Sequence, residues 1–437
     1  MKVLMLGWEF PPYISGGLGT ACYGLTRAMS QMETDIIFVL PKPVNSEYSS
    51  HVKLASPTVR REVTEHEAIP FSLFKNVRFQ QVDSILRPYQ TPQAYETFKQ
   101  HTEVAHQVQF KPRRVKQLVD LGVSDNYGDD LYQEVQRYAQ LAVAVSEEEA
   151  FDIIHAHDWM TYLAGIAVAQ ASGKPLVTHI HSTEFDRSGS DSNTFVRDIE
   201  RLGMESADQV IAVSRLTRAT VIDRYGIAPE KVSVVYNAID QTLGFGRSER
   251  AKDRNREKVV LFLGRITMQK GPEYFLEAAG RVLAEMDNVK FLMAGSGDMT
   301  HRMIEKAAAM GIGHKVHFTG FLKGEAVNEI FRMADLFVMP SVSEPFGLVP
   351  LEALRNDVPV LISKQSGVAE VLTHALKVDF WDIQEMANKI LAVLRHPALQ
   401  TTLRQHGGFE VKRFSWQDSA RQCLAVYDTA MSATQPV

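Results

Sequence analysis

The feature that most constrains this chain is a short apolar run followed by a helical stretch, repeated along both halves of its 437 residues. Alternation of this kind is typical of parallel sheets that carry helices on both faces. The apolar runs of the first half are residues 2–7, 35–40, 152–156, 176–179, 209–213 and 232–235, and those of the second half are residues 258–263, 289–294, 316–319, 335–339 and 358–362. The sequence therefore predicts the α/β class, with one sheet in each half.

Helical periodicity follows most of these runs. It predicts helices at residues 18–29, 160–171 and 215–225 in the first half, and at residues 272–285, 300–310, 324–333 and 348–354 in the second. A last helical pattern covers residues 416–431.

Breaks in this pattern predict the domain organisation. Residues 241–257 are rich in charged residues and glycine and poor in large apolar side chains, which is typical of a linker. We therefore expect a first domain at residues 1–240 and a second at 241–415. Several prolines interrupt residues 42–115, which we interpret as an insertion on the first domain. The terminal helix, within residues 416–437, is expected to pack back on the first domain.

Composition disfavours several classes of protein. The formal net charge of −5 argues against broad electrostatic binding of nucleic acid. Cys22 and Cys423 lie far apart and lack the spacing of metal ligands, so we expect two reduced thiols in a cytoplasmic protein. The N-terminal apolar run is too short for a signal peptide, and no stretch is apolar for long enough to span a bilayer. Peripheral membrane contact and the oligomeric state stay open.

Two cations follow the first apolar run of the second half. Arg265 comes directly after Gly264, and Lys270 precedes Gly271 at the expected start of a helix. In an open parallel sheet, ligands collect beyond the carboxyl ends of the strands. A guanidinium and an ammonium beside a helix N-terminus suit the charges of a diphosphate. Two solvated surface cations are the alternative, which the next motif disfavours.

That motif carries two glutamates, Glu344 and Glu352, after a later apolar run. A carboxylate accepts hydrogen bonds from hydroxyl groups, so Glu344 suits a sugar and Glu352 a ribose. Gly347 lets the backbone come close to a ligand, and the N–H groups from Phe346 to Leu348 can point at anionic oxygens. For either glutamate alone, a helix cap or a surface charge would be a sufficient explanation.

The segment Glu344-Pro-Phe-Gly-Leu-Val-Pro-Leu-Glu352 resembles the E-x7-E signature of retaining glycosyltransferases with the GT-B fold. In that fold, two Rossmann-like domains face each other across a cleft. Over nearly its whole length, the chain resembles the glycogen synthase and sucrose synthase relatives of families 4 and 5. The resemblance implies that Arg265 and Lys270 bind the diphosphate of the sugar donor, Glu344 its sugar and Glu352 its ribose. It also implies an ADP-, UDP- or GDP-sugar as donor, no cofactor and no metal.

A glycine-rich loop joins the first apolar run to the first helix. Gly16 and Gly17 can offer backbone N–H groups to the phosphate or the sugar of the donor. A loop of this kind could equally hold a dinucleotide, although no acidic residue closes the second apolar run, where a nicotinamide ribose would need one. In glycogen synthases the matching loop has a lysine two places before the glycine pair. Ile14 stands there in this chain, which puts preference for the donor of bacterial glycogen synthases in doubt.

Histidines end two of the apolar runs in the first half. His155 and His157 alternate onto one face, and His179 and His181 follow on the next run, so a metal site is a rival interpretation. A metallohydrolase would need further ligands, and no carboxylate-rich strand end accompanies these histidines. We therefore predict no metal.

The segment His155-Ala-His-Asp-Trp159 also closely resembles the His-Ala-His-Asp-Trp of glycogen synthases. The resemblance implies that His157 lies at the transferred sugar and that Asp158 orients it, while His155 is expected in the core. The predicted catalytic residues are therefore His157, Arg265, Lys270 and Glu344. The acceptor side of the cleft is predicted at Asp158, His181 and Glu184.

These motifs favour transfer of a sugar, expected to be glucose, from a nucleotide sugar to a carbohydrate acceptor. Glycogen synthase-like elongation of an α-glucan is the leading expectation, and a lipid-linked or cell-surface polysaccharide is the first alternative acceptor. A sugar-nucleotide epimerase of the same build would need no acceptor. A non-catalytic carbohydrate-binding relative is disfavoured, because the chain keeps the histidine, both cations and both glutamates.

Overall fold

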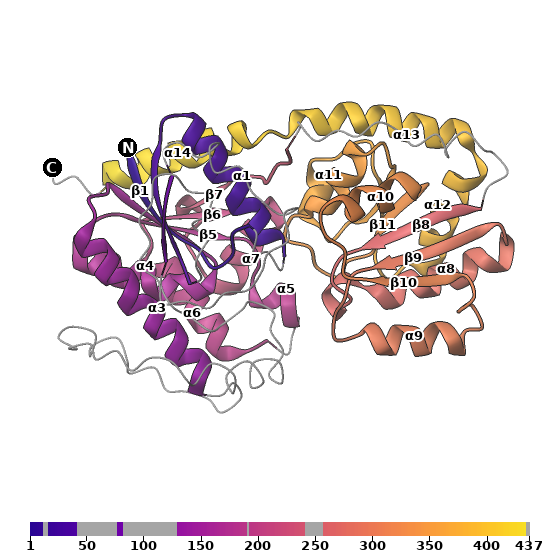
Figure 1. Cartoon of the computed structure of the whole chain (residues 1–437), viewed down its shortest axis with the longest axis horizontal. Helices are drawn as coiled ribbons and strands as arrows, with labels where there is room; N and C mark the ends of the chain where they lie inside the picture. Colours follow the sequence, from indigo (N-terminus) through magenta and orange to yellow (C-terminus); the bar gives the residue numbers. More distant parts are fainter. Residues whose placement is uncertain (12–15, 42–76, 82–128, 190–191, 241–256, 434–437) are drawn as a thin grey trace.

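The computed structural model describes residues 1–11, 16–41, 77–81, 129–189, 192–240 and 257–433. These residues form two parallel sheets, one in each half of the chain, with helices on both faces of each (Figure 1). The predicted α/β class is confirmed.

In the first sheet the strands lie in the order β3-β2-β1-β4-β5-β6-β7. They are β1 (Lys2–Leu6), β2 (Asp35–Leu40), β3 (Val77–Gln81), β4 (Ile153–His157), β5 (Leu176–Ile180), β6 (Gln209–Ala212) and β7 (Val232–Val234). All neighbouring pairs are parallel. Every residue of β4 and β5 is buried, because helices cover both faces, and this explains the continuous apolar runs in the sequence.

In the second sheet the order is β10-β9-β8-β11-β12-β13, again parallel throughout. The strands are β8 (Lys258–Leu263), β9 (Val289–Ala294), β10 (Val316–Gly320), β11 (Leu336–Met339), β12 (Val360–Ser363) and β13 (Leu376–Val378).

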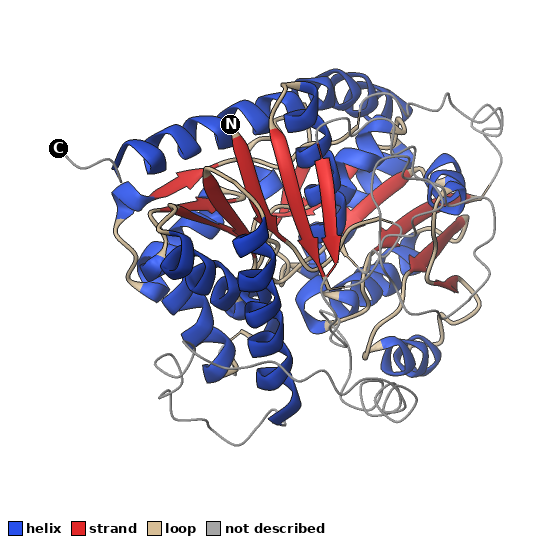
Figure 2. Ribbon diagram, turned by 60° about the vertical axis from the view of Figure 1, so that its left-hand side comes forward, coloured by secondary structure: helices blue, strands red, loops and turns tan. Residues whose placement is uncertain are grey.

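Helices enclose a separate apolar core on each face of each sheet. One face of the first sheet packs on α3 (Asp129–Glu148), α4 (Trp159–Ser172), α6 (Thr194–Ser206) and α7 (Arg215–Tyr225), and the other face packs on α1 (Gly17–Gln31) and α14 (Trp416–Ala433). The second sheet lies between α8 (Pro272–Glu285), α9 (Thr300–Ala309) and α12 (Ile383–Arg395) on one face and α10 (Glu325–Met333) and α11 (Leu348–Arg355) on the other. Figure 2 shows the strands of the first sheet between their helical layers.

The predicted strands and helices match observed elements, with ends that differ by one or two residues. Residues 42–115, which are expected to be an insertion on the first domain, include β3, which extends the sheet as a parallel edge strand beside β2. Its sequence, VRFQQ, is too polar and too short to stand out as an apolar run. The rest of this range, like residues 241–256, lies outside the described residues.

The last helix returns to the first sheet. After α13 (Pro397–Glu410) and the short turn η10 (Val411–Arg413), α14 runs beside α1, as the yellow band in Figure 1 shows. Its first residue, Trp416, lies against Gly24 of α1, where an added Cβ would come within 2.1 Å of the indole ring. Close approach of the two helices therefore requires glycine at this position.

Both cysteines are buried, free thiols. Cys22 lies on α1 and Cys423 on α14, in the core that these helices share. Among the described helices, none combines the length and the apolar character that crossing a membrane would require.

Candidate active site

The chain switches sides once in each sheet, between β1 and β4 in the first and between β8 and β11 in the second. In open α/β sheets, ligands bind at such points, beyond the carboxyl ends of the strands. The glycine loop follows β1 and His157 ends β4, while Arg265 follows β8 and Glu344 follows β11. The topology thus brings all four predicted motifs to the two places where a ligand is expected.

The two switch points lie against each other. Gly16 is the N-cap of α1 and Gly17 its first residue, and a Cβ at Gly17 would lie 3.8 Å from Leu348 Cδ1 at the start of α11. Ser343 Oγ donates a hydrogen bond to Asp186 Oδ1 at 2.5 Å between the same two halves. The first turns of α1 and α11 are therefore close, and their unpaired N–H groups together favour an anion between them.

Lys270 and Glu344 form an ion pair at the switch point of the second sheet, with Nζ and Oε2 2.6 Å apart. Ser341 Oγ donates to the same carboxylate oxygen at 3.3 Å. Arg265 Nη2 donates to Gln269 Oε1 at 3.1 Å, on the turn that carries Lys270. We refer to Arg265, Lys270 and Glu344 as the clamp.

Two glycines with positive φ shape the loops of the clamp. Gly271, at φ +66°, ends the turn η8 (Met268–Lys270), and a Cβ there would lie 2.1 Å from the Pro340 carbonyl oxygen. Gly347, at φ +102°, caps α11, and a Cβ there would lie 3.2 Å from Glu344 Cγ. The Glu344 carbonyl accepts a hydrogen bond from Gly367 N at 2.9 Å. Side chains at either glycine would push the clamp residues apart.

Phe346 is predicted to offer its backbone N–H group to the sugar donor, and its side chain is 3% exposed and belongs to the core beneath α11. Its ring lies 6.1 Å from the ring of Tyr236. Only the backbone of Phe346 is therefore left to face a ligand.

Glu352 and Leu348 line a cavity of about 390 Å³ between α1 and α11. Arg355, Arg27 and Trp416 are also in its wall, whereas the clamp and His157 are not. Burial raises the pKa of Glu352, and the nearby Arg355 opposes that shift. Glu352 thus faces a space that neither the clamp residues nor His157 line.

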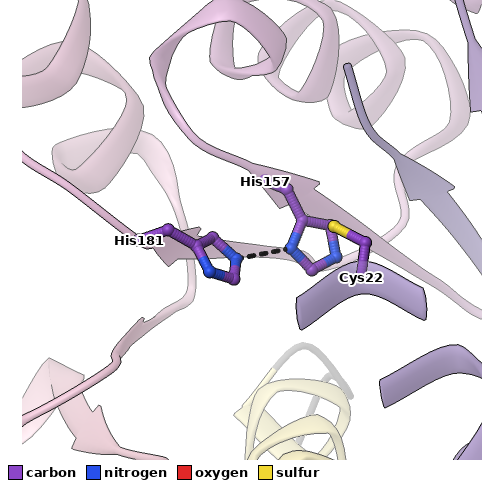
Figure 3. A group of neighbouring side chains, drawn as sticks. All are labelled: Cys22, His157 and His181. Atoms are coloured by element: carbon purple, nitrogen blue, oxygen red, sulfur yellow. Dashed lines mark hydrogen bonds between the residues drawn. The ribbon is translucent and has the colours of Figure 1, made fainter. Parts of the chain in front are cut away.

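Four histidines form a cluster on the face of the first sheet that α1 and α14 cover. We call His155, His157, His179 and His181 the imidazole array. The register pairs His157 with His179, and ring centroids lie 4.1 Å apart for His155 and His157 and 4.2 Å apart for His179 and His181. His157 Nδ1 and His181 Nε2 are hydrogen-bonded at 2.9 Å (Figure 3). His155 and His157 are fully buried, and His181 is partly exposed.

Burial keeps the imidazole array neutral. It lowers the pKa of His155 and of His181 to about 3, and it holds the pKa of His157 and of His179 well below the ordinary value. Nitrogens of His155, His157 and His179 lie within 4.8 Å of one another, so these residues could hold a borderline metal ion.

Cys22 forms a second such group with His157 and His181 (Figure 3). Burial raises the pKa of the Cys22 thiol well above its usual value, however, and this disfavours the thiolate that a metal requires.

Asp158 is expected to orient His157, and in the structure its carboxylate binds the loop after β5. Its Oδ1 accepts the backbone N–H groups of His181 at 2.7 Å and of Ser182 at 3.4 Å. Burial raises the pKa of Asp158 to about 7, and the N–H group of His181 opposes the shift. The carboxylate is thus held beside the loop that carries His181, the hydrogen-bond partner of His157.

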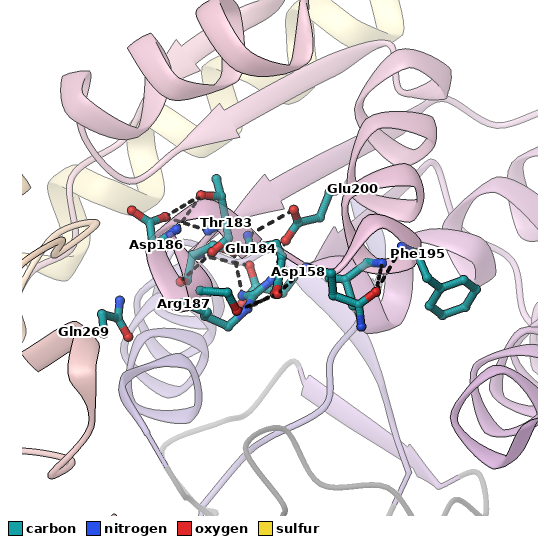
Figure 4. Close-up of polar contacts among 12 residues, drawn as sticks. Asp158, Thr183, Glu184, Asp186, Arg187, Phe195, Glu200 and Gln269 are labelled. Atoms are coloured by element: carbon teal, nitrogen blue, oxygen red, sulfur yellow. Dashed lines mark hydrogen bonds and ion pairs between the residues drawn. The ribbon is translucent and has the colours of Figure 1, made fainter. Parts of the chain in front are cut away.

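Glu184 begins the short helix α5 (Glu184–Ser188) and belongs to a buried ionic network (Figure 4). Its Oε2 accepts from Arg187 Nε at 2.9 Å, and Arg187 Nη2 donates to Glu200 Oε1 at 2.5 Å. Glu200 also accepts the hydroxyl of Tyr225 and the backbone N–H of Glu184. Ser188 Oγ and the N–H of Asn193 donate to Glu184 Oε1, so both carboxylate oxygens hold the α5 segment in place.

Comparison with known proteins identifies the family. A model described as Glycosyltransferase Family 4 matches residues 104–243, and one described as Glycosyl transferases group 1 matches residues 247–407. An uncharacterised glycosyltransferase of Methanocaldococcus jannaschii is 30% identical, over 99% of this chain and 99% of its own length. A solved Anabaena protein in complex with UDP and glucose has a TM-score of 0.67 at 17% identity, covering 98% of this chain and 99% of that chain.

The chain belongs to the GT-B glycosyltransferases. The glycogen synthase of Mycobacterium tuberculosis is 24% identical to this glycosyltransferase, over 98% of its chain and 94% of the synthase. The family and the fold expected from the E-x7-E segment are thereby confirmed.

The sequence did not predict the contacts between the two halves of this glycosyltransferase. Glu370, on η9 (Gly367–Glu370), accepts the N–H groups of Arg215 at 3.0 Å and of Leu216 at 2.6 Å, and so caps α7 of the other half. The hydroxyl of Tyr236 donates to the same carboxylate at 3.1 Å. Ser214 caps α7 locally through the N–H group of Thr217, and no local pattern predicts the additional contact from a residue 155 positions away.

Proposed function

We propose that this glycosyltransferase transfers glucose, with retention and without a metal, from a nucleotide sugar to a carbohydrate acceptor. Elongation of an α-glucan, as by a glycogen synthase, is the favoured reaction. The observation that carries the proposal is the 2.6 Å pair of Lys270 and Glu344, at the switch point of the second sheet and beside the N-termini of α1 and α11.

In this proposal the clamp holds the sugar donor at both ends. Lys270 and Arg265 bind its diphosphate, and Glu344 accepts hydroxyl groups of its sugar. Backbone N–H groups of Gly16, Gly17, Gly347 and Leu348, with that of Phe346, add to the phosphate site. Glu352 accepts the ribose hydroxyls from the cavity side. The ion pair of Lys270 and Glu344 orients both side chains before the donor arrives.

In this proposal His157 acts at the transferred sugar from the first sheet; its ring is fully buried, and the partly exposed His181, hydrogen-bonded to it at 2.9 Å, lies next to it. Asp158, His181 and Glu184 build the acceptor side, with Asp158 and Glu184 fixing the loop and helix that carry it. We place the first domain at residues 1–240 and the second at 241–415, with the terminal helix, within residues 416–437, on the first domain. We propose a cytoplasmic location, which the two buried, free thiols support.

Front-side displacement fits the carboxylates of this site. Retention by a double displacement needs a free carboxylate beside the anomeric carbon. Asp158 already accepts two backbone N–H groups, and Glu184 is held by Arg187, Ser188 and Asn193. In our mechanism the bond from the anomeric carbon to the diphosphate oxygen breaks, and the acceptor oxygen bonds to the same face. The proton of the acceptor hydroxyl passes to the departing diphosphate, whose charge the clamp cations stabilise.

Two relatives support the proposed donor and acceptor: one was solved with a nucleotide and a sugar, and the other is a glycogen synthase. The Anabaena protein was solved with UDP and glucose, and a glycogen synthase matches along almost the whole chain. Both likenesses favour a glucosyl nucleotide over other sugar donors.

The test is nucleotide release from ADP-, UDP- and GDP-glucose, with and without maltotriose, followed by proton NMR of the new anomeric centre. We expect one donor to be used, acceptor-dependent release and an α-linked product.

The Arg265→Ala variant should lose roughly 100-fold in turnover. Arg302→Ala removes an exposed arginine of the same half, paired with Glu273 at 2.9 Å, and should change nothing. If nucleotide is released without any acceptor and the sugar is epimerised, the protein is an epimerase and the proposal is wrong.

A further inference from the structure

The last helix reaches the imidazole array through one hydroxyl group. Tyr427 lies on α14 and is fully buried, and its Oη is 2.6 Å from His155 Nδ1. The rings meet edge to face, with centroids 5.5 Å apart and planes at 74°. The sulfur of Met29, at 3.9 Å, is a much weaker acceptor for the same hydroxyl.

The direction of this hydrogen bond follows from the two groups. A phenol is a better proton donor than a neutral imidazole, and an imidazole nitrogen is a stronger base than a phenol oxygen. The Tyr427 hydroxyl therefore donates, and His155 Nδ1 accepts. Since a neutral imidazole carries one proton, that proton lies on His155 Nε2, which has no hydrogen-bond partner among the described residues. The hydroxyl thus selects one tautomer and one ring orientation of His155.

His155 is in turn the closest ring neighbour of His157. Their centroids are 4.1 Å apart, and His157 is bonded on its other side to His181. Both rings are fully buried in a close-packed face, so the position of one restricts the other. His157 Nε2 is buried and has no hydrogen-bond partner among the described residues.

We infer that Tyr427 is a positioning residue for transfer: through His155, it holds the ring of His157 in the orientation that the sugar requires. The inference rests on the role proposed for His157. Because α14 follows directly from the helices of the second sheet, it also makes the end of the chain part of the active site.

Tyr427→Phe tests this, because it removes the hydroxyl and keeps the ring. Tyr138→Phe is a matched control, since Tyr138 is equally buried on the opposite face of the sheet and, among the described residues, donates its hydrogen bonds to the carbonyl oxygens of Gly7 and Val39. The readouts are imidazole nitrogen NMR signals, assigned with single His→Gln variants, and nucleotide release from UDP-glucose with maltotriose. His157→Ala is measured beside them.

We expect Tyr427→Phe to shift the signals of His155 and His157 and to lower kcat roughly tenfold to 100-fold with little change in KM, since small displacements of a catalytic group have effects of that size. Tyr138→Phe should do neither. Unchanged signals, shifted signals with an unchanged kcat, or equal losses in both variants would overturn the inference. So would a stoichiometric metal ion in the purified protein, because the ion would then hold the imidazoles. If His157→Ala itself keeps full activity, the proposed role of His157 fails first.

Discussion

Replacing His179 with leucine should make the protein lose less stability in acid. His179 is 2% exposed, and neither ring nitrogen has a hydrogen-bond partner among the described residues. Burial holds its pKa well below the ordinary value in the folded chain. The unfolded chain, in contrast, takes up a proton on this residue near pH 6.5.

The direction of this change in stability with pH follows from proton uptake by the unfolded chain. Below about pH 6.5 the unfolded state binds one more proton at His179 than the folded state, so the free energy of unfolding falls as the pH falls, until the folded pKa is reached. For one such histidine the loss between pH 7.5 and pH 5.5 is about 1.4 kcal/mol. His155, His157 and Asp158 are present in both proteins, so their contributions to the free energy of unfolding cancel when the variant is compared with the wild type.

Urea unfolding at pH 7.5 and pH 5.5, followed by circular dichroism, measures this difference. At pH 7.5 we expect the leucine variant to match the wild type within about 1 kcal/mol, because leucine replaces two buried polar atoms that lack partners. His301→Gln, at an exposed histidine, should keep the wild-type pH dependence. Equal pH dependence in wild type and His179→Leu would refute the reasoning, since it would mean that the buried imidazole is protonated in the folded state.

Three further predictions concern packing and the junction of the two halves. Gly24→Ala would place a Cβ 2.1 Å from the ring of Trp416, so it should lower stability by about 1–3 kcal/mol in thermal unfolding. Ser343→Ala leaves the buried carboxylate of Asp186 without a hydrogen bond from the second sheet, and a double-mutant cycle of the two should give a coupling of about 1–3 kcal/mol. Gly347→Ala, at φ +102° and 3.2 Å from the clamp glutamate, should lower nucleotide release more than it lowers the melting temperature.

The fold could be predicted because its signals are local. Strands such as Lys258–Leu263 are buried on both faces and read as unbroken apolar runs, and Pro272 marks the start of α8. The proximity of the clamp residues could be predicted too, since they lie on the segments that follow β8 and β11, and parallel strands end at one edge of the sheet. The edge strand Val77–Gln81 could not be predicted, because so short and polar a run shows no hydrophobic periodicity.

The rest of the site depends on contacts that no local pattern encodes. The repeated His-x-His pattern predicts that two strands each turn two imidazoles to one face, but the register of His157 with His179 sets them side by side. The hydrogen bond of Tyr427 to His155 joins residues 272 positions apart. Helical periodicity predicts only that Tyr427 is buried. Which polar group it meets is decided by how α14 lies on the sheet.

Nucleotide binding to the clamp is the measurement that tests the account most directly. Calorimetric titration with UDP, ADP and GDP should find one that binds, and Lys270→Ala should weaken that binding at least about tenfold, or about 1.4 kcal/mol. Lys290→Ala removes a lysine near the start of β9 that is ion-paired with Glu257 at 2.8 Å, at the edge of the sheet opposite the clamp, and should leave the affinity as it is. Equal affinity in wild type and Lys270→Ala, or no binding of any of the three, would contradict the placement of the sugar donor at Lys270 and Glu344.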